Sequence, residues 1–286
     1  MDQFITTNIL EPGIEELCLN ITLLYPAKAD LLKFDMRWES FYEANGTYKN
    51  IFDRKRNTLT YQSENLIPTK LDQRSPVLLV FGNPASHSVV YRMCFAFEKE
   101  LNAHRIWCAF RKTGFLKFFS DECILTDDSW QARNKQRKKE FFDLEYESPF
   151  RLGITVALSL PSPSSDKIWG GVAGVKKLFG QKAFRIIEAS EKMRLNNIAR
   201  NFLKNSSYGC MITFQRDAYE FLRSSDSPQY SLKLAWANGL IGCGRNGLEA
   251  VPLVGMPPTR YAYTINFCNL LVSIMKKYYQ ARSDLY

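Results

Sequence analysis

The stretch Val77-Leu-Leu-Val-Phe81 is apolar at every position and ends at Gly82, where a polar loop begins and runs to Ser88. A short apolar run of this kind is typical of a central parallel strand, because helices cover both of its faces. Three further segments predict strands: 153–158, 208–214 and 250–255. The intervening and following segments predict helices at 89–97, 101–113, 167–179, 191–205, 217–223 and 263–282. This alternation predicts an α/β fold with three αβα layers and a central, mostly parallel, four-stranded sheet.

The chain before this strand has a different pattern and predicts an N-terminal elaboration. We divide the chain into an N-terminal extension of unknown function, residues 1–74, and an α/β domain, residues 75–286. In the extension, the apolar spacing of 14–24 predicts a helix, and 57–70 predicts a loop or a short strand. In the larger part, 133–139 predicts a solvated helix face, and Gly242-Cys243-Gly244 predicts a flexible turn.

Composition excludes several classes of protein. Of the 286 residues, 45% are hydrophobic and 14% aromatic, which excludes disorder as the main state. The longest apolar run is only as long as a strand, so we expect no membrane partner. Met1-Asp2-Gln3 does not begin a basic and apolar leader, so we expect a cytoplasmic protein, or a nuclear one in a eukaryote. Seven cysteines without two-residue spacing, and two histidines, predict neither disulfides nor a metal site.

The net charge of +9 is concentrated in the C-terminal half of the chain. Residues 148–286 hold 18 basic and 8 acidic side chains, whereas residues 1–74 hold 9 and 11. A basic half indicates a polyanion partner, and scattered solvated lysines are the alternative interpretation.

Four loops follow the carboxyl ends of the predicted strands, where ligands bind in parallel sheets: 82–88, 159–165, 215–216 and 256–261. No G-x-x-x-x-G-K-[ST] or G-x-S-x-G motif is present, so the nucleoside-triphosphate and serine-hydrolase fingerprints are missing. In the first loop, Asn83 offers a neutral amide that can hold a water or a base edge, and Pro84 stiffens the backbone.

The stretch 77–116 resembles the first motif region of the uracil-DNA glycosylase superfamily, and most closely its mismatch-specific uracil/thymine branch. The matching elements are Asn83-Pro84, Ser86 and Ser88, Phe95-Ala96, Arg105-Ile106-Trp107 and Gly114-Phe115. Farther on, Gly153-Ile154-Thr155 is similar to the family's second strand, and 212–219 to its strand–Gly-Lys–x-Ala-Tyr element. The stretch 252–259 stands where the family keeps its Asn/His-Pro-Ser loop, so the likeness spans about residues 75–282 in the correct order.

The chain departs from the family pattern at three places, one of which is a longer segment between Phe95 and Arg105. The first motif has Phe81-Gly82-Asn83 in place of Gly-x-Asn, and the last loop has Pro258-Thr259-Arg260 in place of Pro-Ser-Gly, without a histidine. The cysteine pairs that hold an iron–sulfur cluster in other branches are absent, so the resemblance implies no cofactor.

The resemblance implies a DNA-repair enzyme that flips a base out of DNA and hydrolyses its N-glycosidic bond. Asn83 would position the attacking water. Substrate contacts would come from the rest of the first loop, from an aromatic side chain and from the second strand: Gly82, Pro84, Ala85, Ser86, His87, Ser88, Phe95 and Thr155. The resemblance implies DNA contacts at Arg216, Met256, Pro257, Pro258, Thr259 and Arg260, and we add Lys176 and Lys177 as phosphate contacts.

The expected partner is double-stranded DNA carrying a mispaired or damaged base, bound by a monomer in a pocket with a basic rim. Two alternatives stay open. One is a catalytically inactive nucleic-acid-binding protein on the same fold, and the other is an unrelated α/β nucleotide-processing enzyme that uses the Asn83 loop for phosphate.

Overall fold

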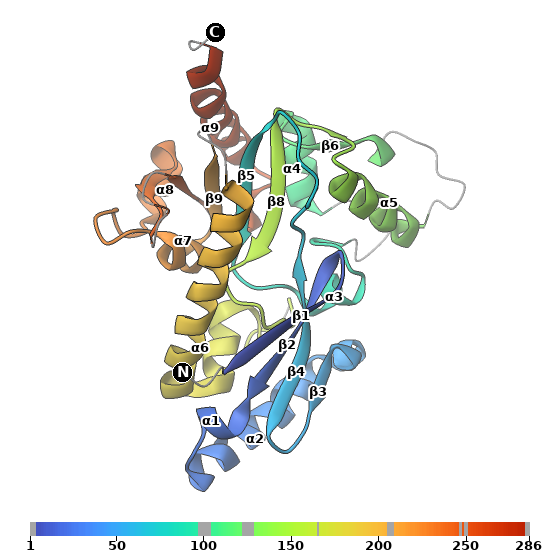
Figure 1. Cartoon of the computed structure of the whole chain (residues 1–286), viewed down its shortest axis with the longest axis vertical. Coiled ribbons are helices and arrows are strands. Elements are labelled where there is room, and N and C mark those ends of the chain that lie inside the picture. The colour runs from blue at the N-terminus through green and yellow to red at the C-terminus, as the bar shows by residue number, and fades with distance from the viewer. Residues whose placement is uncertain are drawn as a thin grey trace.

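The computed structural model describes residues 4–96, 104–121, 129–164, 166–204, 209–245, 248 and 251–283 of the chain. An antiparallel sheet forms before Ser75, and strands alternate with helices after it (Figure 1). The chain therefore has the predicted mixture of helices and sheets. Parts of the predicted elements, at 97, 101–103, 205, 208 and 250, lie outside the described residues.

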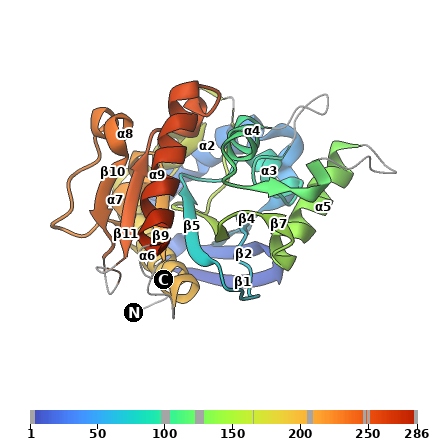
Figure 2. The same ribbon diagram turned by 90° about the horizontal axis from the view of Figure 1, so that it is seen from above.

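The central sheet has five strands in the order β10-β11-β9-β5-β8. Four neighbouring strands are parallel: β5 (Ser75–Phe81), β8 (Phe150–Val156), β9 (Cys210–Phe214) and β11 (Pro252–Met256). The fifth, β10 (Leu240–Cys243), pairs antiparallel with β11. The predicted four-stranded sheet is therefore corrected to a mixed sheet of five, in which β11, β9 and β5 follow one another (Figure 2).

Other elements surround these strands. The helices are α1 (Ile21–Leu24), α2 (Lys28–Ala44), α3 (Ser86–Val90), α4 (Arg105–Thr113), α5 (Trp130–Asp143), α6 (Gly171–Leu203), α7 (Arg216–Leu222), α8 (Leu232–Asn238) and α9 (Ile265–Ser283). Short 3-10 helices lie at Gly46–Ile51, Phe119–Asp121 and Thr259–Tyr261. The smaller strands are β1 (Ile5–Glu11), β2 (Gly13–Asn20), β3 (Phe52–Arg54), β4 (Thr58–Asn65), β6 (Lys117–Phe118) and β7 (Tyr146–Glu147).

The segment predicted as a flexible turn supplies the missed strand β10. Gly242 pairs with Leu253, and Cys243 pairs with Pro252. A Cβ atom at Gly242 would lie 2.4 Å from the hydroxyl oxygen of Tyr219. The glycine therefore permits close packing against α7 and does not mark a turn.

Alternate side chains of β5 enter hydrophobic clusters on the two faces of the sheet. Leu78 and Val80 belong to the cluster that contains side chains of α6 and α7. Val77, Leu79 and Phe81 belong to the cluster that contains side chains of α4 and α9. The continuous apolar run of β5 is explained by this burial on both faces.

The N-terminal residues form an antiparallel sheet in the order β1-β2-β4-β3. Strand β2 occupies most of the segment predicted as a helix, 14–24, so that prediction is wrong. Strand β2 pairs along its length with β4 on one side and with β1 on the other, and this pairing overrides the local apolar spacing. The segment predicted as a loop or short strand contains the eight-residue strand β4.

The antiparallel sheet shares a core with the rest of the molecule. Tyr61 of β4 lies in one hydrophobic cluster with Leu78 of β5 and Leu178 of α6. Two backbone hydrogen bonds of 2.8 Å, one in each direction, join Leu66 to Ile154 of β8. The chain after β4 thus enters the central sheet directly.

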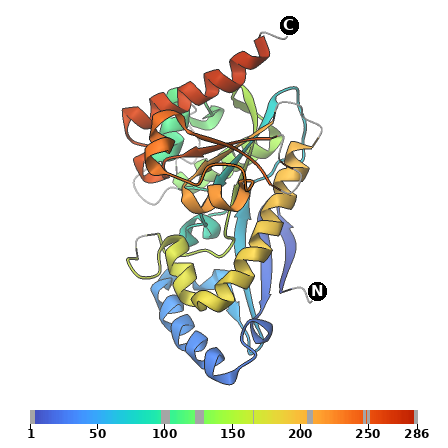
Figure 3. The ribbon, with the colours of Figure 1, turned by 90° about the vertical axis from the view of Figure 1, so that its left-hand side faces the viewer.

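Helix α6 reaches from the N-terminal helix α2 toward the central sheet (Figure 3). The two helices predicted at 167–179 and 191–205 lie largely within this one element, which is broken at Gly180, where φ is +73°. The Tyr25 hydroxyl donates to the Phe179 carbonyl at 2.5 Å, and Arg37 Nε donates to the Leu178 carbonyl at 2.7 Å. N-terminal side chains therefore satisfy carbonyls at the break and fix the direction of the first helical segment.

Two smaller predictions also need correction. The predicted helix 89–97 is cut short, because Arg92 and Phe95 have positive φ angles of 58° and 55°. The predicted solvated face 133–139 is not fully solvated, because Arg137 is buried and forms an ion pair with Asp121. Over the described ranges of the chain, none of the helices has both the length and the apolar character needed to cross a membrane.

Candidate active site

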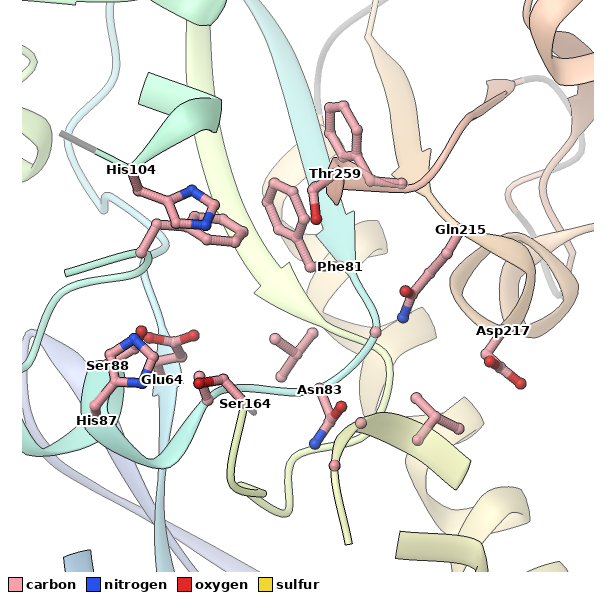
Figure 4. Close-up of a pocket in the computed structure, with 18 of the residues that line it drawn as sticks. Glu64, Phe81, Asn83, His87, Ser88, His104, Ser164, Gln215, Asp217 and Thr259 are labelled. Carbon is pink, nitrogen blue, oxygen red and sulfur yellow. The ribbon is translucent and has the colours of Figure 1, made fainter. Parts of the chain in front are cut away.

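A cavity of about 760 Å³ lies beyond the carboxyl ends of β5, β8 and β9. Its wall combines the loop after β5, the start of α6, the residues that follow β9 and one residue of the loop after β11. Figure 4 shows Glu64, His87 and Ser88 on one side and Gln215 and Asp217 on the other, with Asn83 between them. The cavity is thus at the place where ligands bind in open parallel sheets.

The orientation of the Asn83 amide is fixed by the loop after β8. Its Nδ2 donates to the Leu160 carbonyl at 3.1 Å and to Ser162 Oγ at 2.9 Å. A carbonyl oxygen can only accept, so the nitrogen must face Leu160 and Oδ1 remains as a hydrogen-bond acceptor. Asn83 lines the cavity, where it can hold a polar ligand group or a water molecule.

Backbone hydrogen bonds join the loop after β5 to the loop after β8. Ser86 N donates to the Ser162 carbonyl, and Ser162 N donates to the Pro84 carbonyl, both at 3.0 Å. Ser162 Oγ also accepts from Gly171 N at 2.8 Å, at the start of α6. Ser162 therefore connects both loops and the helix to the Asn83 amide.

Phe95 lies in a strained backbone conformation beside the cavity. Its φ angle of 55° is in the left-handed region that a non-glycine residue rarely adopts. Its ring is stacked on His104, with centroids 4.7 Å apart, and meets Phe81 edge-on at 4.8 Å. Since His104 covers one side of the ring, a planar ligand can use only the remaining surface of Phe95.

His104 is held as a neutral imidazole at the start of α4. Its Nδ1 accepts from Ile106 N at 3.2 Å, so the hydrogen of the neutral ring sits on Nε2. Burial lowers the pKa of His104 to about 4, with smaller effects of the same sign from Arg105 and His87. At neutral pH the ring therefore carries a hydrogen-bond donor without a positive charge.

The side chain of Gln215 occupies the space beside Gly82. A Cβ atom at Gly82 would lie 1.4 Å from Gln215 Nε2, which crosses the strand end at this point. Gln215 itself has φ of 146°, a conformation that favours glycine. The strained backbone of Gln215 thus lies at the cavity wall. Asp217, two residues farther on, also lines the cavity and forms an ion pair with Lys176 at 3.1 Å.

The structure brings many, but not all, of the predicted site residues together. The predicted residues that line the cavity are Gly82, Asn83, Ala85, His87, Ser88, Phe95 and Thr259. Pro84, Ser86 and Pro257 are buried, and Pro258 is partly exposed, outside this lining. Asn83 and Thr259 thus line the same pocket.

Two other predictions place side chains where the structure does not. Thr155 is fully buried within β8, and its hydroxyl has no hydrogen-bond partner among the described residues. Met256 is fully buried and belongs to the core, not to a DNA-contacting surface. Arg216 and Arg260 are exposed outside the cavity lining, so their predicted DNA contacts stay predictions.

The wall of the cavity is not basic. Its described charged residues are Glu64, Arg105 and Asp217, so acidic groups outnumber basic ones. Lys176 and Lys177 are exposed on the first turns of α6, where Lys176 pairs with Asp217. The described wall of the pocket therefore carries no excess of basic side chains.

Sequence reasoning missed several polar wall residues, among them Glu64, His104 and Asp217. Glu64 comes from β4 in the N-terminal sheet, far from any predicted motif. His104 directly precedes the matched Arg105-Ile106-Trp107 segment, so its position in the sequence could have indicated it. In the part of the chain that the structure describes, no three His, Cys, Asp or Glu side chains gather as a metal site would require.

No protein-family model matches this chain, and no curated protein is significantly similar to it in sequence. The likeness to uracil-DNA glycosylases therefore depends on the residues quoted above.

Proposed function

We propose that the protein is a DNA glycosylase that excises uracil, or a related mispaired or deaminated base, by hydrolysing the N-glycosidic bond. In this proposal residues 75–286 form a glycosylase-like αβα domain, with the four parallel strands as its core and β10 as an addition. The observation that carries the proposal is the Asn83 amide, whose nitrogen is held by Leu160 and Ser162, while no described residue donates to Oδ1, which can accept from a water.

Asn83 would act by holding the water that attacks the sugar. As the N-glycosidic bond breaks, its electron pair leaves with the base, and C1′ develops oxocarbenium character. The water adds to C1′, and its proton ends on the departed base, so the products are a free base and an abasic sugar. An amide cannot remove that proton, so Asn83 would act by positioning the water. Correct positioning of a reactant can raise a reaction rate by several orders of magnitude.

The rest of the wall suits a planar base with carbonyl groups. Phe81 and Phe95 offer aromatic surface, and base–aromatic stacking contributes roughly 1–3 kcal/mol. The neutral His104 ring supplies one donor for charge that grows on the departing base. The first turn of α6, Gly171 to Ala173, also lines the cavity, and its backbone N–H groups favour an adjacent phosphate.

One further backbone feature supports the resemblance. Gln215 stands at the position where the family element has glycine, and its φ of 146° is a conformation that glycine adopts most easily. The glycine-like backbone at Gln215 therefore supports the match to that element.

The test is cleavage of duplexes that carry uracil, a thymine mispair or hypoxanthine, followed by strand scission at the abasic site. Wild type should cut at least one of them, and Asn83→Ala should be slower by roughly 100-fold or more while binding DNA with similar affinity. Asn197→Ala, an exposed position on α6, is the matched control and should cleave at the wild-type rate.

Two alternatives give different outcomes in the same experiment. A non-catalytic nucleic-acid-binding protein would bind these duplexes with steep salt dependence and cut none of them. A nucleotide-processing enzyme would show no salt-dependent DNA binding.

A further inference from the structure

The first half of helix α6 carries positive charge and no negative charge. Residues 171–187 contain no acidic side chain and four basic ones, all of them exposed: Lys176, Lys177, Lys182 and Arg185. In the described part of the chain Lys176 pairs with Asp217 at 3.1 Å, and no carboxylate forms an ion pair with the other three. Their charge is therefore available to a partner outside the chain.

Side chains of this segment line a groove of about 390 Å³ on the surface of the helix, which we call the α6 groove. Its described lining consists of Lys176, Lys177, Gln181, Phe184, Arg185 and Glu188. These residues come from both sides of the break at Gly180, where the two segments of α6 meet at an angle (Figure 3). Glu188 pairs with Lys192 at 3.1 Å. The described lining therefore has three cations and one anion, in contrast to the wall of the cavity.

Aromatic rings hold two of the ammonium groups in place. Lys176 Nζ lies 5.4 Å from the ring centroid of Phe184, and Lys177 Nζ lies 5.2 Å from that of Trp169. Both rings are buried, so each gives its lysine a fixed surface to rest on. A cation that is already positioned loses less side-chain freedom when it binds an anion.

The α6 groove begins about one turn from the cavity. The first turn of α6, Gly171 to Ala173, lines the cavity, and Lys176 lines the groove. Asp217, the ion-pair partner of Lys176, is itself part of the cavity wall. A chain-like ligand with one unit in the cavity can therefore continue into the groove along the surface of α6.

We propose that the α6 groove and the adjoining turn bind the phosphodiester backbone of DNA, with Lys177, Lys182 and Arg185 each contacting a phosphate. An α-helix rises about 1.5 Å per residue, so Lys177 and Arg185 lie roughly 12 Å apart along the axis. This is the length of roughly three or four nucleotide steps of a duplex strand, at about 3.4 Å each. A row of unpaired cations over this length is complementary to a chain of phosphates more than to a single anion.

The choice of DNA rests on the proposed function, but the test measures binding and not cleavage. The probe is a short, undamaged, fluorescently labelled DNA duplex, which contains no base for the enzyme to excise. The measured quantities are the dissociation constant and the slope of its logarithm against the logarithm of the salt concentration, between about 50 and 200 mM.

Neutralising the three cations should weaken DNA binding and its salt dependence together. The variant Lys177→Gln/Lys182→Gln/Arg185→Gln should bind the duplex roughly tenfold or more weakly than wild type at about 100 mM salt. Its slope should be smaller by roughly two to three, because each phosphate contact contributes about 0.9. The variant Lys177→Arg/Lys182→Arg/Arg185→Lys keeps the charges and should keep the wild-type slope.

The matched control is Lys112→Gln/Lys276→Gln/Lys277→Gln, three exposed positions on α4 and α9. Each neutralised triple variant lowers the formal net charge of +9 by three, to +6. The C-terminal end of α9 lies away from the start of α6 (Figure 1). The control should therefore bind the duplex with the wild-type slope.

Several results would overturn the proposal. Equal losses in the two neutralised variants would show that net charge alone acts, and an unchanged slope in the α6 variant would show that the groove does not contact phosphates. Wild type that binds polyglutamate more weakly than DNA supports the proposal, and the reverse order refutes DNA as the partner. If a thermal melt shows that the triple variant is unfolded, Lys182→Gln alone should reduce the slope by roughly one, and no reduction refutes the role of α6.

The groove and the glycosylase can fail separately. If wild type cleaves uracil DNA but the α6 variant binds the duplex as wild type does, the groove is refuted and the glycosylase proposal stands. If the α6 variant loses salt-dependent binding but wild type cleaves nothing, the groove stands and the glycosylase proposal fails.

Discussion

A buried, neutral carboxyl group at Glu64 has a consequence for stability that needs no substrate. In the unfolded chain Glu64 has the ordinary pKa of 4.5, and in the folded chain burial raises this pKa to about 8. The folded state therefore holds a proton that the unfolded state releases. The stabilisation is present in full below pH 4.5 and is lost as the pH rises toward 8.

The size of the effect follows from the two pKa values. Over the interval from pH 4.5 to about 8, at about 1.4 kcal/mol per pH unit, ionisation of Glu64 lowers the free energy of unfolding by roughly 5 kcal/mol. Between about pH 6 and pH 8.5 the loss is roughly 2 to 3 kcal/mol, because the unfolded chain is already ionised at pH 6. Any water that reaches the carboxyl from the cavity reduces this figure.

The assay is urea unfolding of wild type and Glu64→Gln at about pH 6 and pH 8.5, where His104 is neutral in both states for most of the interval. Across this pH range the free energy of unfolding of wild type should fall by roughly 2 kcal/mol more than that of Glu64→Gln. Other groups titrate equally in both proteins and cancel in the difference. Identical pH profiles for the two proteins would show that Glu64 is ionised when folded and would refute the argument.

Three further predictions concern the frame of the site. Arg194→Met leaves Glu15 and Glu191 buried without their cation and should cost roughly 3–5 kcal/mol in urea unfolding, whereas exposed Arg200→Met should cost little. Gly82→Ala should weaken uracil-duplex binding because its Cβ meets the Gln215 amide, and a second substitution, Gln215→Ala, should restore it; no rescue would contradict the steric reading. Ser162→Ala removes acceptors for Asn83 and Gly171 and should slow cleavage more than it lowers the melting temperature, by roughly tenfold in rate; an unchanged rate would show that Ser162 does not position Asn83.

The parallel core could be predicted because its signal is local. Strand β5 is apolar at nearly every position, and helices on both faces require that composition. The position of Asn83 followed from the same signal, because a loop after a central parallel strand faces the ligand site. The likeness to glycosylase motifs contributed Phe95 and Thr259, which the structure places at the same cavity.

The missed features depend on contacts between distant residues. Strand β2 has helical apolar spacing, but its backbone groups pair with β1 and β4. The sequence around Gly242 predicts a turn because it contains no sign of the distant Tyr219. The hydroxyl of Tyr219 occupies the space where a Cβ atom of residue 242 would lie. Glu64 looked like any polar strand residue, since only the packing of β4 against α3 places its carboxyl in the cavity.

The N-terminal sheet and the cavity are connected by more than Glu64. The Ser86 hydroxyl donates to Asn45 Oδ1 at 2.5 Å, and Tyr61 shares a hydrogen bond of 2.8 Å with Ser159, at the start of the loop that holds Asn83. Arg37 supports the break in α6 that sets the direction of the helix start. Each contact positions a cavity loop from a different N-terminal element. Removing residues 1–74 would therefore disturb the Asn83 loop, the Ser162 loop and the start of α6 together, so the role of this sheet must be measured by single substitutions.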